Sequence, residues 1–325
     1  MAGSGDHIKA LVRSHASGDD DSFYAVAAQI AAQEARKGHN RLARDLKRAI
    51  DAARQQPVAK RPTPVTPIAQ PRGDLSELVT ATFPEVGLGD LVGPMQLLEQ
   101  IKSVLTEQRQ RQNLIEQGFS PAHKLLLEGP PGTGKTLSAR VIAHELSLPL
   151  LTIRMDSVMS KFLGETASKL RIVFDAAETQ RAVYLFDEFD ALGGDRGASD
   201  VGEARRIVSS FLVFLEQLGS ESIVVAATNH RTILDRALFR RFDTVVRYDL
   251  PSAGEGVEVM KMRLGPLGDG LEWHKIGAEG GGMSHADLVK AAEAAGKKAV
   301  MRGEDRVHTA DLIEALSIRR GGQSG

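Results

Sequence analysis

The stretch Gly129-Pro130-Pro131-Gly132-Thr133-Gly134-Lys135-Thr136 fits the pattern G-x-x-x-x-G-K-[S/T] of a phosphate-binding loop. An apolar run, 125–127, precedes it and a helix-compatible stretch, 136–146, follows it, as the pattern requires. The glycines let the backbone curl around an anion with its N–H groups pointing inward, beside the positive end of a helix dipole. Lys135 is expected to reach the β- and γ-phosphates, and the Thr136 hydroxyl to bind Mg²⁺. The loop therefore predicts a site for ATP and Mg²⁺ rather than a glycine-rich turn.

A pair of acidic residues follows another apolar run, about 50 residues beyond the phosphate loop. Asp187 and Glu188 come directly after residues 182–186, which predict a buried parallel strand. The carboxyl end of such a strand lies beside the phosphate loop in this topology. We expect Asp187 to hold Mg²⁺ through its water shell and Glu188 to act as general base on the attacking water. Asp190 is either a further site residue or a residue that begins a helix or loop.

A polar amide closes another apolar run. Asn229 follows residues 223–227 and Thr228, at the end of a further expected strand. An amide at this place can hydrogen-bond both the attacking water and the γ-phosphate. The alternative is an ordinary turn residue, but beside the loop and the acidic pair we expect a catalytic role for Asn229.

Composition limits the function classes. The 325-residue chain is 42% hydrophobic and 26% charged, which is typical of a globular protein. Its net charge of -1 does not favour nucleic-acid binding. The absence of cysteine excludes disulfides, thiolate metal sites and a thiol nucleophile. We find no signal peptide and no apolar run of the roughly 20 residues that span a bilayer. We expect a soluble, cytoplasmic protein without a membrane partner.

The chain divides by pattern into four segments. Residues 1–56 have apolar residues at helical spacing and predict a small helical domain that binds a partner or substrate. Residues 57–74 hold five of the 13 prolines and predict an extended linker. Residues 75–250 alternate strands and helices, which predicts a parallel sheet with crossover helices, and residues 251–325 predict a small α-helical domain. The expected strands are 124–128, 150–154, 182–186, 223–227 and 245–249, and the clearest helices in the last segment are 286–301 and 309–318.

Four motifs together resemble the AAA family of hexameric ATPases. They are the phosphate loop, YLFDEFDAL at 184–192, ATNH at 227–230 and LDRALFRRFD at 234–243. The similarity covers roughly residues 83 to 318. It implies an α/β fold with the P-loop NTPase sheet and flanking helices, an α-helical lid, and ATP hydrolysis by a homo-oligomer, expected to be a hexamer.

The resemblance also implies an adenine pocket. GLGDLVG at 87–93 is similar to the family segment that lines this pocket, and GMSHADL at 282–288 is similar to the motif that opens a lid helix. His285 either touches the nucleotide or has a capping or surface role. The implied nucleotide contacts are Leu91, Val92, Gly93, Pro131, Gly132, Thr133, Gly134, Lys135, Thr136, Leu137, Ser284 and Ala286.

Two arginines stand before Phe-Asp in the last motif. In the family, arginines at this place reach the active site of the neighbouring subunit and neutralise charge on the transferring phosphoryl group. Arginine suits this task because its planar guanidinium grips phosphate oxygens and is always charged. Arg240 and Arg241 match these positions, but the Pro-Gly that often separates the two arginines is missing, so their division of labour stays open.

Residues 157–166, SVMSKFLGET, resemble the family's central-pore loop. Its core is Lys161, Phe162, Leu163 and Gly164. An aromatic side chain facing a channel can grip a polypeptide without sequence preference. The alternative is that Phe162 belongs to the hydrophobic core.

Three uses of ATP are compatible with these motifs. The pore motif favours a remodeller or unfoldase that threads a protein substrate. An assembly switch that recruits a partner protein without threading is the alternative. A DNA-handling ATPase is disfavoured by the neutral net charge. The short N-terminal helical segment before one AAA module also resembles bacterial ATPases paired with separately encoded subtilisin-like proteases, so a protease is a possible partner.

Overall fold

The computed structural model describes residues 71, 73–160, 163–192, 197–229 and 239–321. The helices expected in 1–56 lie outside the described residues, as does nearly all of the linker 57–74. Both stay predictions, together with the boundaries of the domains.

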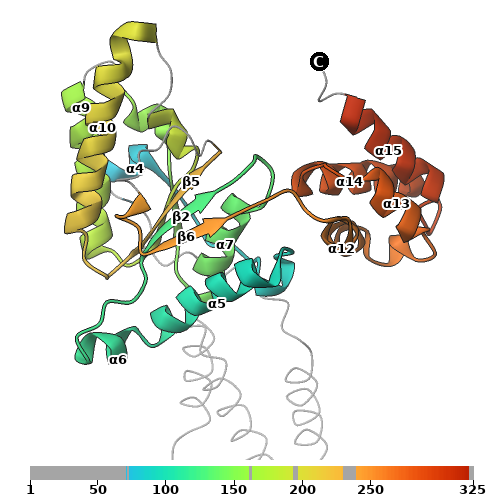
Figure 1. Cartoon of the computed structure of the whole chain (residues 1–325), viewed down its shortest axis with the longest axis horizontal. Coiled ribbons are helices and arrows are strands. Elements are labelled where there is room, and N and C mark those ends of the chain that lie inside the picture. The colour runs from blue at the N-terminus through green and yellow to red at the C-terminus, as the bar shows by residue number, and fades with distance from the viewer. Residues whose placement is uncertain (1–70, 72, 161–162, 193–196, 230–238, 322–325) are drawn as a thin grey trace, which may run out of the picture. The chain divides into compact units, whose positions relative to one another are not determined.

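A six-stranded sheet forms the centre of the α/β part, in the order β1-β3-β4-β5-β2-β6 (Figure 1). All neighbouring strands are parallel except β1, which pairs antiparallel with β3 at one edge. The five expected strands are confirmed, with ends that shift by one or two residues. The strands are β1 (Val79–Thr82), β2 (Lys124–Glu128), β3 (Leu150–Ile153), β4 (Val183–Phe186), β5 (Ile223–Thr228) and β6 (Thr244–Arg247).

Sequence patterns missed β1. It has only four residues, follows directly on the short helix α4 (Leu75–Leu78), and has one buried side chain, Val79. An edge strand this short has no apolar run that could distinguish it from a loop.

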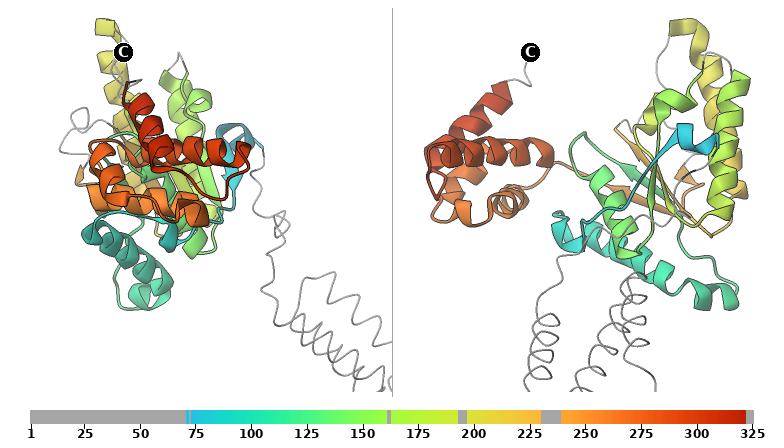
Figure 2. Two further views of the ribbon diagram at one scale, coloured as in Figure 1. Left: turned by 90° about the vertical axis from the view of Figure 1, so that its right-hand side faces the viewer. Right: turned by 180° about the vertical axis from the view of Figure 1, so that it is seen from behind.

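Helices cover both faces of the sheet (Figures 1 and 2). The central strands β4 and β5 are buried along their whole length, so each face needs a layer of helices. α5 (Met95–Arg109) and α7 (Lys135–Glu145) contribute to the core on one face, and α9 (Leu163–Thr179) and α10 (Gly197–Gln217) to the core on the other. The shorter elements are η2 (Leu88–Asp90), α6 (Arg111–Glu116), α8 (Met155–Val158) and η3 (Phe189–Leu192).

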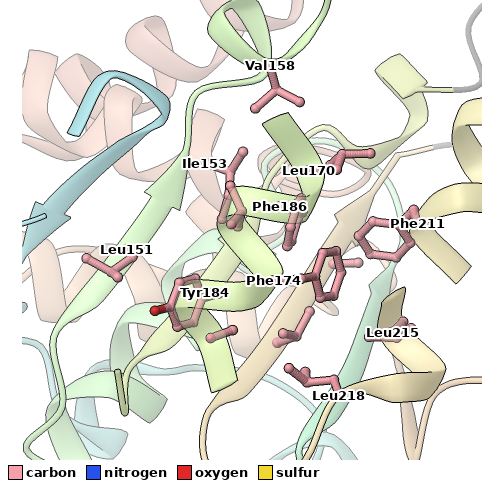
Figure 3. Close-up of a cluster of buried hydrophobic side chains, with 14 of the residues drawn as sticks. Leu151, Ile153, Val158, Leu170, Phe174, Tyr184, Phe186, Phe211, Leu215 and Leu218 are labelled. Atoms are coloured by element: carbon pink, nitrogen blue, oxygen red, sulfur yellow. The ribbon is translucent and has the colours of Figure 1, made fainter. Parts of the chain in front are cut away.

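Phenylalanines fill the core beneath α9 and α10. Figure 3 shows Phe174, Phe186 and Phe211 together with aliphatic side chains of β3 and α10. The ring of Phe211 lies 5.3 Å from that of Phe174 and 5.0 Å from that of Phe186, both edge to face. This packing holds β4, whose end carries the acidic pair, against the helical layer.

The segment after β6 is helical in its described part, residues 248–321. Its helices pack around a hydrophobic core of their own (Figure 2). The two expected helices are confirmed, with two more before them. They are α12 (Ala253–Leu264), the short η4 (Gly265–Gly268), α13 (Trp273–Glu279), α14 (His285–Met301) and α15 (Thr309–Gly321). Among the described residues, no helix is both long and apolar enough to cross a membrane.

Candidate active site

The phosphate loop connects β2 to α7, as its flanks predict. Its first residue, Gly129, has a φ of 153° and lies so close to β6 that an added Cβ would be 2.2 Å from the Tyr248 carbonyl oxygen. Only glycine allows this approach. The loop ends at Gly134, the residue before α7, so the N-terminus of that helix points into the loop. The local geometry is therefore that of an anion-binding site.

Lys135 lies inside the curve of the loop. Its Nζ donates hydrogen bonds to the carbonyl oxygens of Gly129, at 2.8 Å, and Pro130, at 2.7 Å. Burial lowers the pKa of Lys135, and the carboxylates of Asp187 and Asp190 oppose that shift. The ammonium group is thus held in place where the phosphates are expected.

Thr136 and Asp187 meet, although they are far apart in sequence. The Thr136 hydroxyl donates to the Asp187 carboxylate at 2.7 Å. Hydroxyl and carboxylate oxygens suit Mg²⁺, which takes few protein ligands and completes its shell with water and phosphate oxygens. The pair therefore fits the expected metal site, and the Mg²⁺ ligands themselves stay a proposal.

Glu188 has an unusual backbone conformation. Its φ is 51°, in the left-handed region that residues other than glycine seldom adopt. Its amide donates to the Asp187 carboxylate at 2.9 Å, which stabilises the sharp turn at the end of β4. Such strain costs about 1–3 kcal/mol and is typical of functional positions. The side chain of Glu188 is exposed, so it is accessible to a water beside bound nucleotide.

Asn229 follows β5 and is brought to the acidic turn. Its backbone N–H donates to the Asp190 carboxylate at 3.2 Å, and the Thr228 hydroxyl donates to the same oxygen, also at 3.2 Å. The described structure thus unites the ends of β2, β4 and β5, with the phosphate loop, the acidic pair and the amide at one edge of the sheet. The sequence left open whether Asp190 belongs to the site or begins a helix or loop, and in the structure it is hydrogen-bonded to Thr228 and Asn229.

Comparisons with known proteins agree with this geometry. The model of the family "ATPase family associated with various cellular activities (AAA)" matches residues 125–250. A protein of Sinorhizobium fredii described as "Uncharacterized AAA family ATPase y4kL" is 33% identical over 326 residues, which cover 98% of this chain and 97% of that protein. The chain is an AAA family ATPase.

This AAA ATPase is also similar to parts of longer proteins. "ATP-dependent zinc metalloprotease FtsH 3" of Sphaerobacter thermophilus is 32% identical over 253 residues, 75% of this chain and 52% of that protein. "ATP-dependent zinc metalloprotease FtsH" of Caldicellulosiruptor bescii is 32% identical over 243 residues, 72% of this chain and 39% of that protein. The ATPase thus spans about half or less of the length of these two relatives.

The two segments expected at the adenine come to the phosphate loop from opposite ends of the ATPase sequence. Leu91 is buried, and one of its methyl groups would lie 3.9 Å from a Cβ added at Gly134. From the helical segment, the Ala286 N–H donates to the Gly132 carbonyl oxygen at 3.0 Å. A Cβ added at Gly132 would lie 2.6 Å from the Ser284 hydroxyl, so the loop needs glycine here.

The residues around Ala286 have separate tasks. Ser284 caps α14 by accepting a hydrogen bond from the Asp287 N–H at 3.2 Å. Burial lowers the pKa of His285, against the opposing effects of the Glu255 carboxylate and the Val92 backbone. The cap of α14 is therefore Ser284 and not His285. Contact of Ser284, Ala286, Val92 and Gly93 with adenine stays a prediction.

Two other residues of the loop differ in exposure. Pro131 is exposed, whereas Thr133 is buried. The Thr133 hydroxyl donates a hydrogen bond to the Pro130 carbonyl oxygen at 2.8 Å. Leu137 packs partly against the core beneath α5 and α7. Its expected contact with the nucleotide would use only the exposed remainder of the side chain.

Arg240 and Arg241 are exposed and lie at the other end of the sheet. They precede Asp243, whose carboxylate accepts hydrogen bonds from the N–H groups of His123 and Lys124, each at 2.9 Å, at the start of β2. The phosphate loop begins at the opposite end of this five-residue strand, about 16 Å away at the usual rise per residue. Within this chain, Arg241 forms an ion pair with Glu216 of α10.

Only part of the expected pore loop, including half of its four-residue core, can be located. Lys161 and Phe162 lie outside the described residues. Leu163 and Gly164 begin α9, and residues 155–158 form α8, so 157–166 is not a continuous loop. The Ser160 N–H donates to the Thr166 hydroxyl at 3.0 Å, which joins the short connection to the first turn of α9. The resemblance to a pore loop did not indicate that a helix begins at Leu163.

Proposed function

We propose that this AAA ATPase assembles as a homo-hexameric ring in the cytoplasm and uses ATP hydrolysis to remodel or unfold protein substrates that pass through a central pore. The position of Arg241 carries the proposal. An arginine at the start of β6 is separated from the phosphate loop of its own chain by the length of β2. A second subunit that places its Arg241 at this loop would complete the site, and a closed ring would complete every site in the same way.

Each residue of the proposed site has one task. Lys135 and the loop N–H groups bind the phosphates, while Thr136 and Asp187 hold Mg²⁺. When bound, Mg²⁺ neutralises charge on the β- and γ-phosphates. Glu188 accepts a proton from the attacking water, and Asn229 orients that water. Arg240 and Arg241 of the neighbouring subunit stabilise the charge that develops on the γ-phosphate.

The proposed substrate is a polypeptide. An aromatic side chain at position 162, if it faces the pore as the resemblance implies, would offer apolar contact that is independent of the sequence of the substrate, which suits threading. Two of the relatives are described as ATP-dependent zinc metalloproteases, so protein handling is represented among similar ATPases. We propose a partner protein for this ATPase, and a separately encoded protease is one form that this partner can take.

The proposal can be tested in two steps. Glu188→Gln in the full chain should keep ATP bound without hydrolysis and retain a substrate, which cross-linking and mass spectrometry would identify. Unfolding of the captured protein is then measured with wild type and with Phe162→Ala. Phe162→Ala should abolish unfolding while changing basal ATPase activity by no more than about twofold, because a pore residue does not touch the reacting atoms.

Phe119→Ala is the matched control. Phe119 is 66% exposed and lies outside the proposed loop, so its removal should change neither activity. Unfolding that survives Phe162→Ala would overturn the threading proposal and favour an ATP-dependent switch that recruits a partner without threading.

A further inference from the structure

Asp190 lies in η3, directly after the acidic turn of β4. Its neighbour Phe189 is fully buried, and the Phe189 ring lies 4.6 Å from the ring of Phe211 in α10. This packing fixes the backbone of η3 against the helical layer. Asp190 itself is only partly buried and is turned toward the end of β5.

One oxygen of Asp190 accepts two hydrogen bonds. The donors are the Thr228 hydroxyl and the Asn229 N–H, both at 3.2 Å. Backbone pairing between β4 and β5 ends at Phe186 and Ala226. Asp190 therefore joins the segments that follow β4 and β5, beyond the last backbone pair of the two strands. The expected catalytic side chains lie in these same two segments.

Thr228 also reaches the phosphate loop. Its carbonyl oxygen accepts a hydrogen bond from the Gly129 N–H at 3.3 Å, and Thr228 is the last residue of β5 that pairs with β2. The bonds of Asp190 thus join η3 to the same residue that supports the start of the loop. A shift of Asp190 would displace the Thr228 side chain and the Asn229 backbone, to which Asp190 is hydrogen-bonded.

We propose that Asp190 is a positioning residue for ATP hydrolysis, which acts through Thr228 and Asn229 to hold the Asn229 amide in register with Glu188. A carboxylate suits this task because an ionised acceptor forms stronger hydrogen bonds than a neutral one. The inference rests on the proposed role of Asn229 and is independent of ring threading.

Steady-state kinetics of the full chain with Mg²⁺ and ATP test the inference. Asp190→Ala removes both acceptor contacts, and kcat should fall by about 10–100-fold, as expected when an aligned hydrogen-bonding group is misplaced. Affinity for a fluorescent ATP analogue should change by less than about threefold, because the loop and Lys135 are intact. Asp190→Asn keeps an oxygen acceptor and should restore kcat to within about threefold of wild type.

A double-mutant cycle separates positioning from direct catalysis. If Asp190 acts through Asn229, Asp190→Ala combined with Asn229→Ala should be no slower than Asn229→Ala alone. Fully additive losses would overturn the route through Asn229, as would normal turnover of Asn229→Ala. If Asp190→Asn is as slow as Asp190→Ala, the charge itself is required and the positioning role is wrong.

A second variant covers the case in which Asp190→Ala does not fold. Thr228→Val removes one of the two donors and should lower kcat with ATP affinity retained, whereas Thr228→Ser should keep wild-type kcat. Equal kcat for Thr228→Val and Thr228→Ser would contradict the proposal. Normal kcat of Asp190→Ala would also overturn the inference, whereas unfolding that survives Phe162→Ala would concern the threading proposal alone.

Discussion

The two ends of the parallel strands β2 to β6 carry different kinds of side chain, although each strand has only four to six residues. At the carboxyl ends lie the glycines of the phosphate loop, a hydroxyl, acidic groups and an amide, which are joined by hydrogen bonds within one chain. At the amino ends lie Arg240 and Arg241, both exposed. One end is organised to bind a nucleotide, and the other carries two exposed arginines, one of which forms an ion pair with Glu216.

This difference is informative because the proposed site needs groups from both ends. At the carboxyl end Lys135 is the cation expected to bind phosphate, and the segment before Asp243 that carries the two arginines lies about a strand length away. Phosphoryl transfer gains much from a guanidinium placed on the developing charge. We therefore interpret each chain as carrying two half-sites. A complete active site would combine the carboxyl end of one chain with the amino end of its neighbour.

The strongest test of the comparison is to inactivate the two ends in different subunits. Lys135→Ala should prevent ATP binding, and Arg241→Ala should lower kcat by about 10³-fold, since arginine fingers contribute at least that much. Each variant alone should be inactive. In an equal mixture, half of the sites have an intact loop and half of those face an intact arginine, so activity should recover to about a quarter of wild type. Phosphate release measured across mixing ratios gives the result.

The same mixture with Arg240→Ala in place of Arg241→Ala assigns the principal arginine. The arginine whose replacement lowers activity more, and whose variant recovers more activity on mixing, makes the larger contribution to catalysis. No recovery at any ratio, with ring assembly confirmed by light scattering, would show that the two ends do not meet in trans.

Glu188→Gln tests the carboxyl end by itself. The replacement has the same shape and removes the base, so kcat should fall by about 10²–10³-fold while ATP remains bound. Glu and Gln differ little in backbone preference, so the turn at φ 51° should form in both. Phosphate release and binding of a fluorescent ATP analogue measure the two effects. Asn229→Ala serves as comparison, with an expected smaller loss, and normal turnover of Glu188→Gln would exclude the base assignment.

The carboxyl end was largely predictable because its information is local. The loop, the acidic pair and Asn229 each follow an apolar run directly, and parallel strands bring such positions to one edge. The five strands of the parallel part were found for the same reason. Strand ends shifted by one or two residues, since side-chain pattern does not determine where backbone pairing stops.

Contacts between distant segments were not predictable. Asp190 bonds to residues 38 and 39 positions away, and this depends on β4 and β5 being neighbours in the sheet. The approach of Gly129 to Tyr248 likewise depends on β6 lying next to β2. The distance of Arg241 from its own loop follows from strand direction, which a motif alone does not contain. Residues 161–162, the centre of the pore prediction, lie outside the described part.

The smallest expected effect concerns how the amino end is held. The Asp243 carboxylate accepts from two consecutive backbone N–H groups, those of His123 and Lys124, where β2 begins. Asp243→Ala leaves both donors without this partner, and because water can reach the site the free energy of unfolding should fall by about 0.5–1.5 kcal/mol. Because Asp243 is two residues from Arg241, the same change should also reduce kcat without altering ATP affinity. Urea unfolding and ATPase kinetics of the full chain measure the two consequences.

Asp243→Asn is the matched control, since its amide oxygen can accept the same hydrogen bonds at lower strength. Its stability and kcat should lie between those of Asp243→Ala and wild type. Equal stability of all three proteins would mean that backbone pairing of β2 with β6 is enough to hold the start of the strand. A loss of kcat without a loss of stability would instead assign Asp243 to the arginines alone, so the amino end would be organised for the neighbouring site rather than for the fold.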